Sequence, residues 1–99
     1  MNSPVAYKVT ANIYCSSFRE AYFAGRCMAQ DTGLDFQGTC DSDVAVLDKI
    51  VRTHAEACEL ELKARQWFEK YGFGTKSHDE NKHGEGGVRF EGLVPEASR

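Results

Sequence analysis

The sequence predicts a two-layer α+β domain in which two helices cover one face of a small, mainly antiparallel sheet. Apolar and polar residues alternate in residues 5–14 and 88–94, as in half-buried strands. One helical pattern follows Ser17. A second one extends from residue 41 to residue 71 and is followed by Gly72. The 99 residues suit a single domain, 1–99, because multidomain enzymes and (β/α)₈ barrels need a longer chain. The expected element order is β-α-β-α-β.

The first helix is predicted for residues 18–30. Ser17 and Glu20 occupy the two positions of a capping box, in which each side chain accepts a hydrogen bond from a free backbone N–H group. Ala21, Gly25 and Ala29 recur at every fourth position and form a shallow groove on the helix. Because glycine lowers helix propensity by about 1 kcal/mol, we expect a strand or helix to pack closely there.

A short strand is expected over residues 34–40, and a second, long helix over residues 41–71. Thirty helical residues would span roughly 45 Å, more than the ~34 Å diameter of a compact domain of this size. The helix therefore either extends beyond its domain or bends near residues 60–63.

The end of this helix carries an apolar stripe, which must be buried against another part of the chain or another molecule. One alternative is intramolecular, through the bend or through the strand at 88–94. The other is an interface with a second protein molecule, since aromatic residues are common interface anchors. We predict the interface, in a homodimer. The stripe consists of Leu60, Ala64, Trp67, Phe68 and Tyr71.

Two weaker candidate sites involve basic side chains. Residues 75–86 form a polar segment expected to be an exposed loop, and residues 95–99 a tail. His78 and His83 in that loop, or Arg19 and Arg26 on the first helix, could hold a small anionic, nucleotide-like ligand in a pocket between subunits. Ordinary solvated surface charge is the simpler interpretation.

His54 and Cys58 are four residues apart, a spacing at which two side chains on one helix can supply half of a zinc site. A zinc-stabilised module is thus a further alternative. We expect them instead to be core residues, because no close-spaced pair of ligands accompanies them. The same pair could act as nucleophile and base, but nothing in the sequence supplies the remaining catalytic groups. We expect no cofactor, no metal and no enzymatic activity.

The net charge of −3 and the scattered Lys and Arg residues make nucleic acid an unlikely partner, since phosphate contacts need a clustered basic surface. Neither a signal peptide nor a membrane span is recognisable. The four cysteines, none in a C-x-x-C pair, are therefore expected to be reduced thiols in a cytoplasmic protein.

The function expected from these observations is non-enzymatic binding of another protein. In size, mild acidity and layout the chain resembles small proteins encoded by phages and mobile elements, including anti-CRISPR proteins. That resemblance implies an inhibitor that acts through protein contact. A binding protein for an anionic small molecule is the main alternative.

Overall fold

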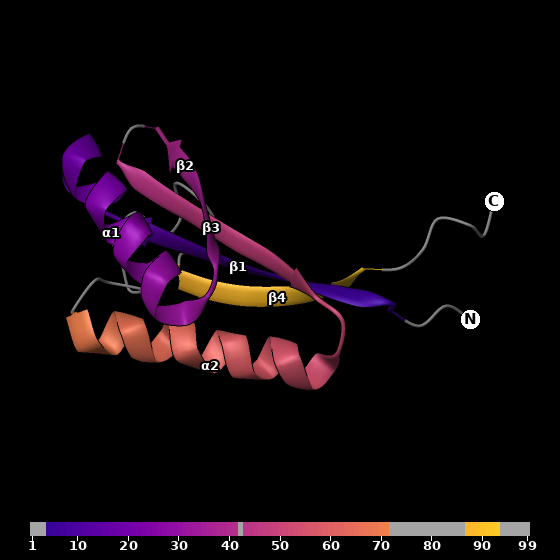
Figure 1. The fold of residues 1–99 in the computed structure, drawn as a ribbon. Coiled ribbons are helices and arrows are strands. Elements are labelled where there is room, and N and C mark those ends of the chain that lie inside the picture. Colours follow the sequence, from indigo (N-terminus) through magenta and orange to yellow (C-terminus); the bar gives the residue numbers. More distant parts are fainter. Residues whose placement is uncertain (1–3, 42, 72–86, 94–99) are drawn as a thin grey trace.

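The computed structural model describes residues 4–41, 43–71 and 87–93. They form four strands and two helices in the order β-α-β-β-α-β (Figure 1). The elements are β1 (Ala6–Tyr14), α1 (Phe18–Thr32), β2 (Asp35–Cys40), β3 (Val44–Val51), α2 (His54–Tyr71) and β4 (Gly87–Leu93).

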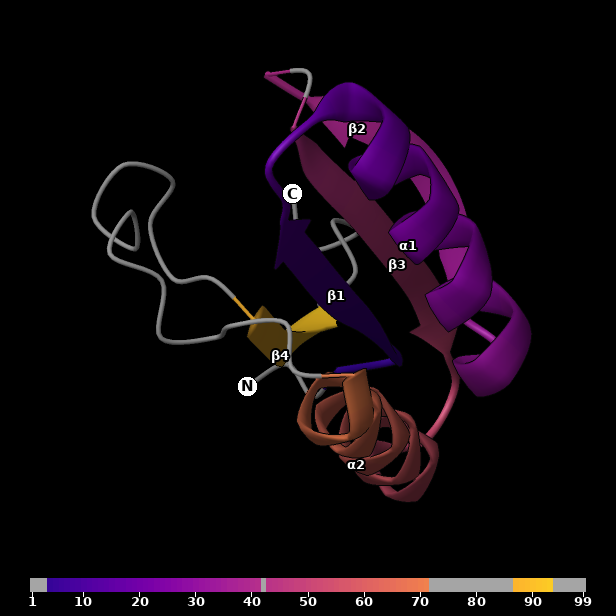
Figure 2. The same cartoon turned by 90° about the vertical axis from the view of Figure 1, so that its left-hand side faces the viewer.

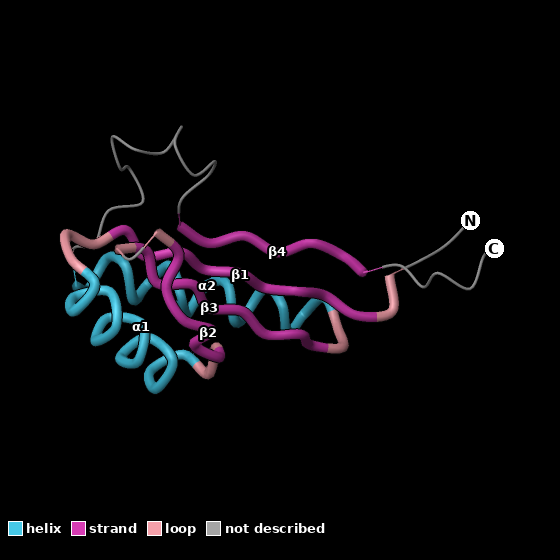
Figure 3. Tube along the Cα trace, turned by 90° about the horizontal axis from the view of Figure 1, so that it is seen from above, coloured by secondary structure: helices cyan, strands magenta, loops and turns pink. Residues whose placement is uncertain are grey.

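The four strands form one antiparallel sheet in the spatial order β2-β3-β1-β4, and both helices lie on the same face of it (Figure 2). The predicted α+β class and antiparallel sheet are thereby confirmed. This combination of element order and strand order is the ferredoxin-like, split β-α-β arrangement. It leaves β2 and β4 as the two edge strands (Figure 3).

The predicted helix over residues 41–71 is wrong in its first part. Residues 44–51 form β3, a central strand that pairs with β1 on one side and β2 on the other. The helix begins at His54 and continues without interruption to Tyr71, so it has 18 residues and no bend at 60–63. Four strands, rather than the expected three, form the sheet.

A capping box fixes the start of α2. The Thr53 hydroxyl accepts a hydrogen bond from the Glu56 backbone N–H at 3.1 Å, and the Glu56 carboxylate accepts from the backbone N–H of Thr53 at 3.2 Å and of Arg52 at 3.1 Å. These bonds satisfy N–H groups that have no partner within the helix. Because of this box, only two residues separate the end of β3 at Val51 from the start of α2 at His54.

The cap of α1 differs slightly from the prediction. The Ser17 hydroxyl accepts from the Glu20 N–H at 3.1 Å, as expected. The Glu20 carboxylate, however, accepts from the backbone N–H and the hydroxyl of Ser16, both at 2.7 Å, rather than from Ser17. These two hydrogen bonds lower the pKa of Glu20, because they stabilise its charged form.

The core lies between the sheet and the helices. Alternate residues of β1 point into it, and Met28 of α1 and Leu47 of β3 are fully buried there. The predicted close approach at Gly25 is confirmed, because the ring of Phe36 on β2 occupies the space that a Cβ at this position would need. α2 covers β1 and β4. The predicted segments 75–86 and 95–99 lie outside the described residues.

Candidate functional site

Large aromatic side chains are exposed along α1. Phe18 is 58% exposed, Tyr22 40% and Phe23 64%. Phe18 and Tyr22 are one helical turn apart, Phe23 follows Tyr22 in the sequence, and the partly buried Phe36 of β2 lies beside Tyr22. We call Phe18, Tyr22, Phe23 and Phe36 the aromatic surface.

The rings of the aromatic surface touch one another through Tyr22. Its ring centroid lies 6.2 Å from that of Phe18, 6.1 Å from that of Phe23 and 5.7 Å from that of Phe36. The Phe23 and Phe36 rings meet Tyr22 edge to face, a favourable arrangement for aromatic pairs. The four side chains are therefore one continuous patch rather than scattered exposed residues.

Arg26 joins the patch one turn further along α1. Its guanidinium carbon lies 5.6 Å from the centre of the Tyr22 ring, within cation–π distance, and its Nη1 donates a hydrogen bond to the Tyr22 hydroxyl at 3.2 Å. The contacts hold the guanidinium against the rings. Aromatic residues and arginine are the types enriched at the centres of protein interfaces.

An open groove of about 840 Å³ runs between α1 and β2 beside these rings. Among the described residues, the charged ones along it are Arg26 of α1 and Asp35 of β2. Asp35 pairs with Asp48, so its side chain lies on the sheet face away from the helices. The lining residues of the groove are Tyr22, Phe23, Arg26, Cys27, Ala29, Gln30, Gly33, Leu34, Asp35 and Phe36. The groove thus combines an apolar wall with the basic side chain of Arg26.

The strand that borders the groove is short and irregular. β2 has six residues, and its register against β3 shifts between Phe36 and Gly38, which marks a β-bulge. Gly38 has a φ of 121°, which an L side chain rarely adopts. Short bulged edges resist the addition of another strand. The features available for binding here are therefore side chains more than backbone.

The interface predicted on the second helix is corrected by the structure. Leu60, Ala64, Trp67 and Phe68 are buried within the chain itself, each at most 7% exposed. They need no second molecule to cover them, which agrees with the intramolecular alternative. Because residues 44–51 are a strand, the whole of α2 lies on the sheet instead of extending past it. Of the five residues only Tyr71, 43% exposed, remains accessible.

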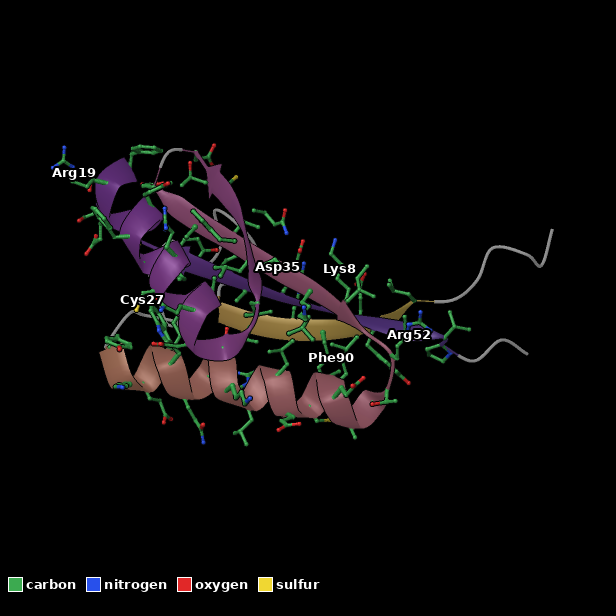
Figure 4. All side chains as sticks on the ribbon, in the orientation of Figure 1. Lys8, Arg19, Cys27, Asp35, Arg52 and Phe90 are labelled. Carbon is green, nitrogen blue, oxygen red and sulfur yellow. The ribbon has the colours of Figure 1, made fainter. Side chains whose placement is uncertain are left out.

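The predicted anion-binding side chains are not gathered into one site. Arg19 and Arg26 are both exposed on α1, two turns apart, or roughly 10 Å along the axis. Arg19 lies near the start of the helix, at one end of the molecule (Figure 4). His78 and His83 lie outside the described residues.

His54 and Cys58 lie close together on α2, with 3.5 Å between the Cys58 Sγ and the His54 Nδ1. Both are exposed, so the expectation that they are core residues is wrong. The His54 ring instead packs edge to face against Tyr7 of β1 and Phe90 of β4, which joins the start of α2 to the sheet. Among the described residues, no three His, Cys, Asp or Glu side chains are grouped to hold a metal.

All four cysteines are free thiols. Burial, together with repulsion of the thiolate by the nearby carboxylates of Glu20 and Asp43, raises the pKa of Cys15 to about 12. A thiol in this environment stays protonated at neutral pH and is a poor nucleophile. Cys15 is therefore a packing residue.

The sheet face opposite the helices carries mixed charge. Lys8 forms an ion pair with Asp48 at 3.8 Å, and the Gln37 side-chain amide donates to the same carboxylate at 2.9 Å. These partly exposed pairs satisfy one another within the chain. They contribute little stability, as is usual for surface ion pairs. They give this face no dominant charge for recognising a partner.

The aromatic surface was not identified from the sequence, although the spacing of its residues on α1 indicates it. Phe18 and Tyr22 are one helical turn apart, and Phe23 adjoins Tyr22 in the sequence, directly after a capping pattern. The buried small residues Ala21 and Gly25 mark the inward side of the helix, and Phe23 lies on the side away from it. This pattern indicates that Phe23 points outward.

No known family profile matches the chain, and no curated protein is significantly similar to it in sequence. None of the helices in the described part is long and apolar enough to cross a membrane. The ferredoxin-like arrangement hosts many unrelated functions, so functional inference rests on the site residues.

Proposed function

We propose that this protein acts by binding another protein molecule through the aromatic surface, without catalysis. The observation that carries the proposal is the continuous, solvent-exposed contact of Phe18, Tyr22 and Phe23, with Phe23 64% exposed. Burial of three such rings would remove several hundred Å² of surface from water, since each aromatic side chain buries roughly 150–250 Å². Exposed apolar patches of this size commonly mark interaction sites.

The proposal keeps the role expected from the sequence, that of a small cytoplasmic inhibitor of the kind that phages and mobile elements encode. It moves the binding residues from α2 to α1. An anionic small molecule is a weaker candidate for the groove, because the Arg26 guanidinium already donates a hydrogen bond to the Tyr22 hydroxyl. A thermal-shift panel of nucleotides separates the two, since a tight ligand raises the melting temperature.

Site-specific crosslinking tests the proposal directly. A photoreactive phenylalanine analogue replaces Phe23 in one variant and Leu62 in the control, because Leu62 is similarly exposed, at 55%, but lies on α2. The variants are expressed in the organism that encodes the protein, and adducts are identified by mass spectrometry. We expect a discrete protein adduct from position 23 that is absent from position 62. The same adducts from both positions, or none from position 23, would contradict the proposal.

A further inference from the structure

We infer that the partner of the aromatic surface is an amphipathic helix of another protein, which carries two acidic residues that face Arg19 and Arg26. The inference rests on the proposed function, because it names the chemistry of the partner that this surface binds. Three observations carry it: the charges on the exposed side of α1, the distance between the two arginines, and the shape of the β2 edge.

The two arginines lie on the exposed side of α1, among its rings. At 100° per residue, Arg19 and Arg26 are within about 20° of each other around the helix, between Tyr22 and Phe23. Both are exposed, and neither forms an ion pair within the described residues. A guanidinium has five N–H donors, of which the Tyr22 hydroxyl takes one from Arg26. Both arginines are therefore available to a partner.

The acidic residues of α1 point to other sides of the helix. Glu20 is about 100° around the axis from Arg19, and Asp31 about 140° from Arg26. The Glu20 carboxylate accepts hydrogen bonds at the helix cap, and Asp31 accepts one from the Tyr71 hydroxyl of α2 at 3.5 Å. The exposed side of α1 is therefore basic and aromatic, although the chain has a net charge of −3. Charge complementarity selects an acidic partner, and the rings select one with apolar side chains.

The distance between the arginines suits a helix. Arg19 and Arg26 are seven residues apart, which is roughly 10 Å along the axis of α1. Two acidic residues seven positions apart on a partner helix have the same separation and share one side of it. In an extended strand, residues on one side lie roughly 7 or 13 Å apart. A helix aligned with α1 thus places one carboxylate at each arginine and its apolar residues against Phe23 between them.

The irregular edge of β2 also distinguishes a helix from an extended peptide. A peptide added as a further strand needs a regular edge of backbone N–H and C=O groups. The bulge at Phe36 and Gly38 interrupts that edge, and the strand has only six residues. A helix binds through its side chains, and the open groove of about 840 Å³ beside α1 offers it apolar contacts.

Charge reversal combined with crosslinking at position 23 tests the inference on the full chain. Arg19→Glu and Arg26→Glu are each introduced beside the photoreactive residue, and Lys63→Glu, an equal change of charge at an exposed position of α2, is the control. Each arginine variant should lower the yield of the protein adduct by at least about tenfold, because like charges then face one another. The control and Arg26→Lys, which keeps the charge, should retain the adduct. Circular dichroism checks that each variant folds.

The crosslinked segment then provides a direct binding assay. Mass spectrometry identifies the segment, which should contain acidic residues about seven positions apart on either side of the crosslinked residue. A synthetic peptide of this segment is titrated with the protein by fluorescence anisotropy. A peptide with lysine in place of these acids should lose binding to the wild type by at least about tenfold and regain it with the double variant Arg19→Glu, Arg26→Glu.

Four results would overturn the inference and leave the proposed function standing: a crosslinked segment without the acidic residues or without helical spacing, an adduct between two copies of this chain, full adduct yield from both arginine variants, or a lysine peptide that binds the wild type undiminished. The last measurement decides the matter if an arginine variant fails to fold. An adduct with nucleic acid alone, or no adduct at position 23, would refute the proposed function as well.

Discussion

The ring of Phe36 on β2 lies directly on Gly25 of α1 and fills the space of the missing side chain. The contact lets the helix and the edge strand approach closely and sets the position of Phe36 beside Tyr22, 5.7 Å between ring centres. One glycine inside the helix thus connects the packing of the fold with the aromatic surface.

Gly25→Ala should destabilise the protein by about 1–3 kcal/mol, because the new methyl group overlaps the Phe36 ring. In a Phe36→Ala background the same substitution should have the opposite sign. Without the Phe36 ring, the new methyl group meets no obstacle, and alanine favours the helix over glycine by up to about 1 kcal/mol. Urea unfolding of the four proteins in this double-mutant cycle measures the reversal. If Gly25→Ala costs the same in both backgrounds, the two residues are not coupled.

The sequence was sufficient to predict β1, α1, β2, β4 and the close packing at Gly25, but not β3. Val44, Leu47 and Val51 have helical spacing, and this pattern predicts the start of a long helix. β3 is a central strand with apolar residues on both faces, among them the buried neighbours Val44 and Ala45, so it lacks the alternation of a half-buried strand.

The error in β3 produced the error in the site. A thirty-residue helix would leave Trp67 and Phe68 uncovered, whereas the 18-residue α2 lies on β1 and β4 and buries both. The capping box of Thr53 and Glu56 was the local signal that could have located the true helix start. The strand order determines whether the sheet covers the aromatic residues of α1 or those of α2. The sequence pattern does not contain that order.

Trp67→Phe tests the corrected role of the end of α2. Trp67 is 3% exposed and contacts the rings of Phe68 and Tyr71, so the loss of volume should lower the free energy of unfolding by about 1–3 kcal/mol. Leu62→Ala, at an exposed position of the same helix, should change it by less than about 0.5 kcal/mol. Neither should alter the oligomeric state. If Trp67→Phe changes the sedimentation coefficient and leaves the stability unchanged, Trp67 belongs to an interface between molecules and not to the core.

Thr53→Ala should destabilise the protein by about 1 kcal/mol, because it removes the acceptor for the Glu56 backbone N–H at the start of α2. Glu56→Ala should cost a similar amount, since its carboxylate accepts from two backbone N–H groups. Glu59→Ala, an exposed position one turn further on, serves as control. Equal stability of the Thr53 variant and the wild type in chemical denaturation would show that the box does not hold the helix end.

Glu20 should contribute a small pH dependence to stability. Its folded-state pKa lies below that of the unfolded chain because of the two bonds from Ser16, so its contribution is present at neutral pH. It is lost as the pH falls from about 5 through the lowered folded-state pKa. Glu20→Gln should flatten this part of the stability curve. Thermal melts between about pH 3 and pH 7 measure it, and an unchanged curve for the variant would contradict the assignment.

Cys15 should react more than about a hundredfold more slowly with iodoacetamide at pH 8 than the exposed Cys58, because its raised pKa leaves almost no thiolate. Peptide mass spectrometry after timed labelling gives the rate at each cysteine. In denaturant the two rates should become similar, which provides the internal control. Comparable rates in the folded protein would mean that Cys15 is neither desolvated nor close to Glu20 and Asp43.

The pairing of Ala6 with Leu93 at one end of the sheet has a practical consequence for construction of variants. The described chain enters and leaves the domain side by side, whereas Phe18 is reached only after β1 has run its length, roughly 30 Å for nine residues. A tag, fluorophore or surface tether attached through either of these strand ends would start far from the beginning of α1. The domain could also be inserted into a surface loop of a carrier protein through two adjacent junctions, with the rings of α1 directed away from the carrier.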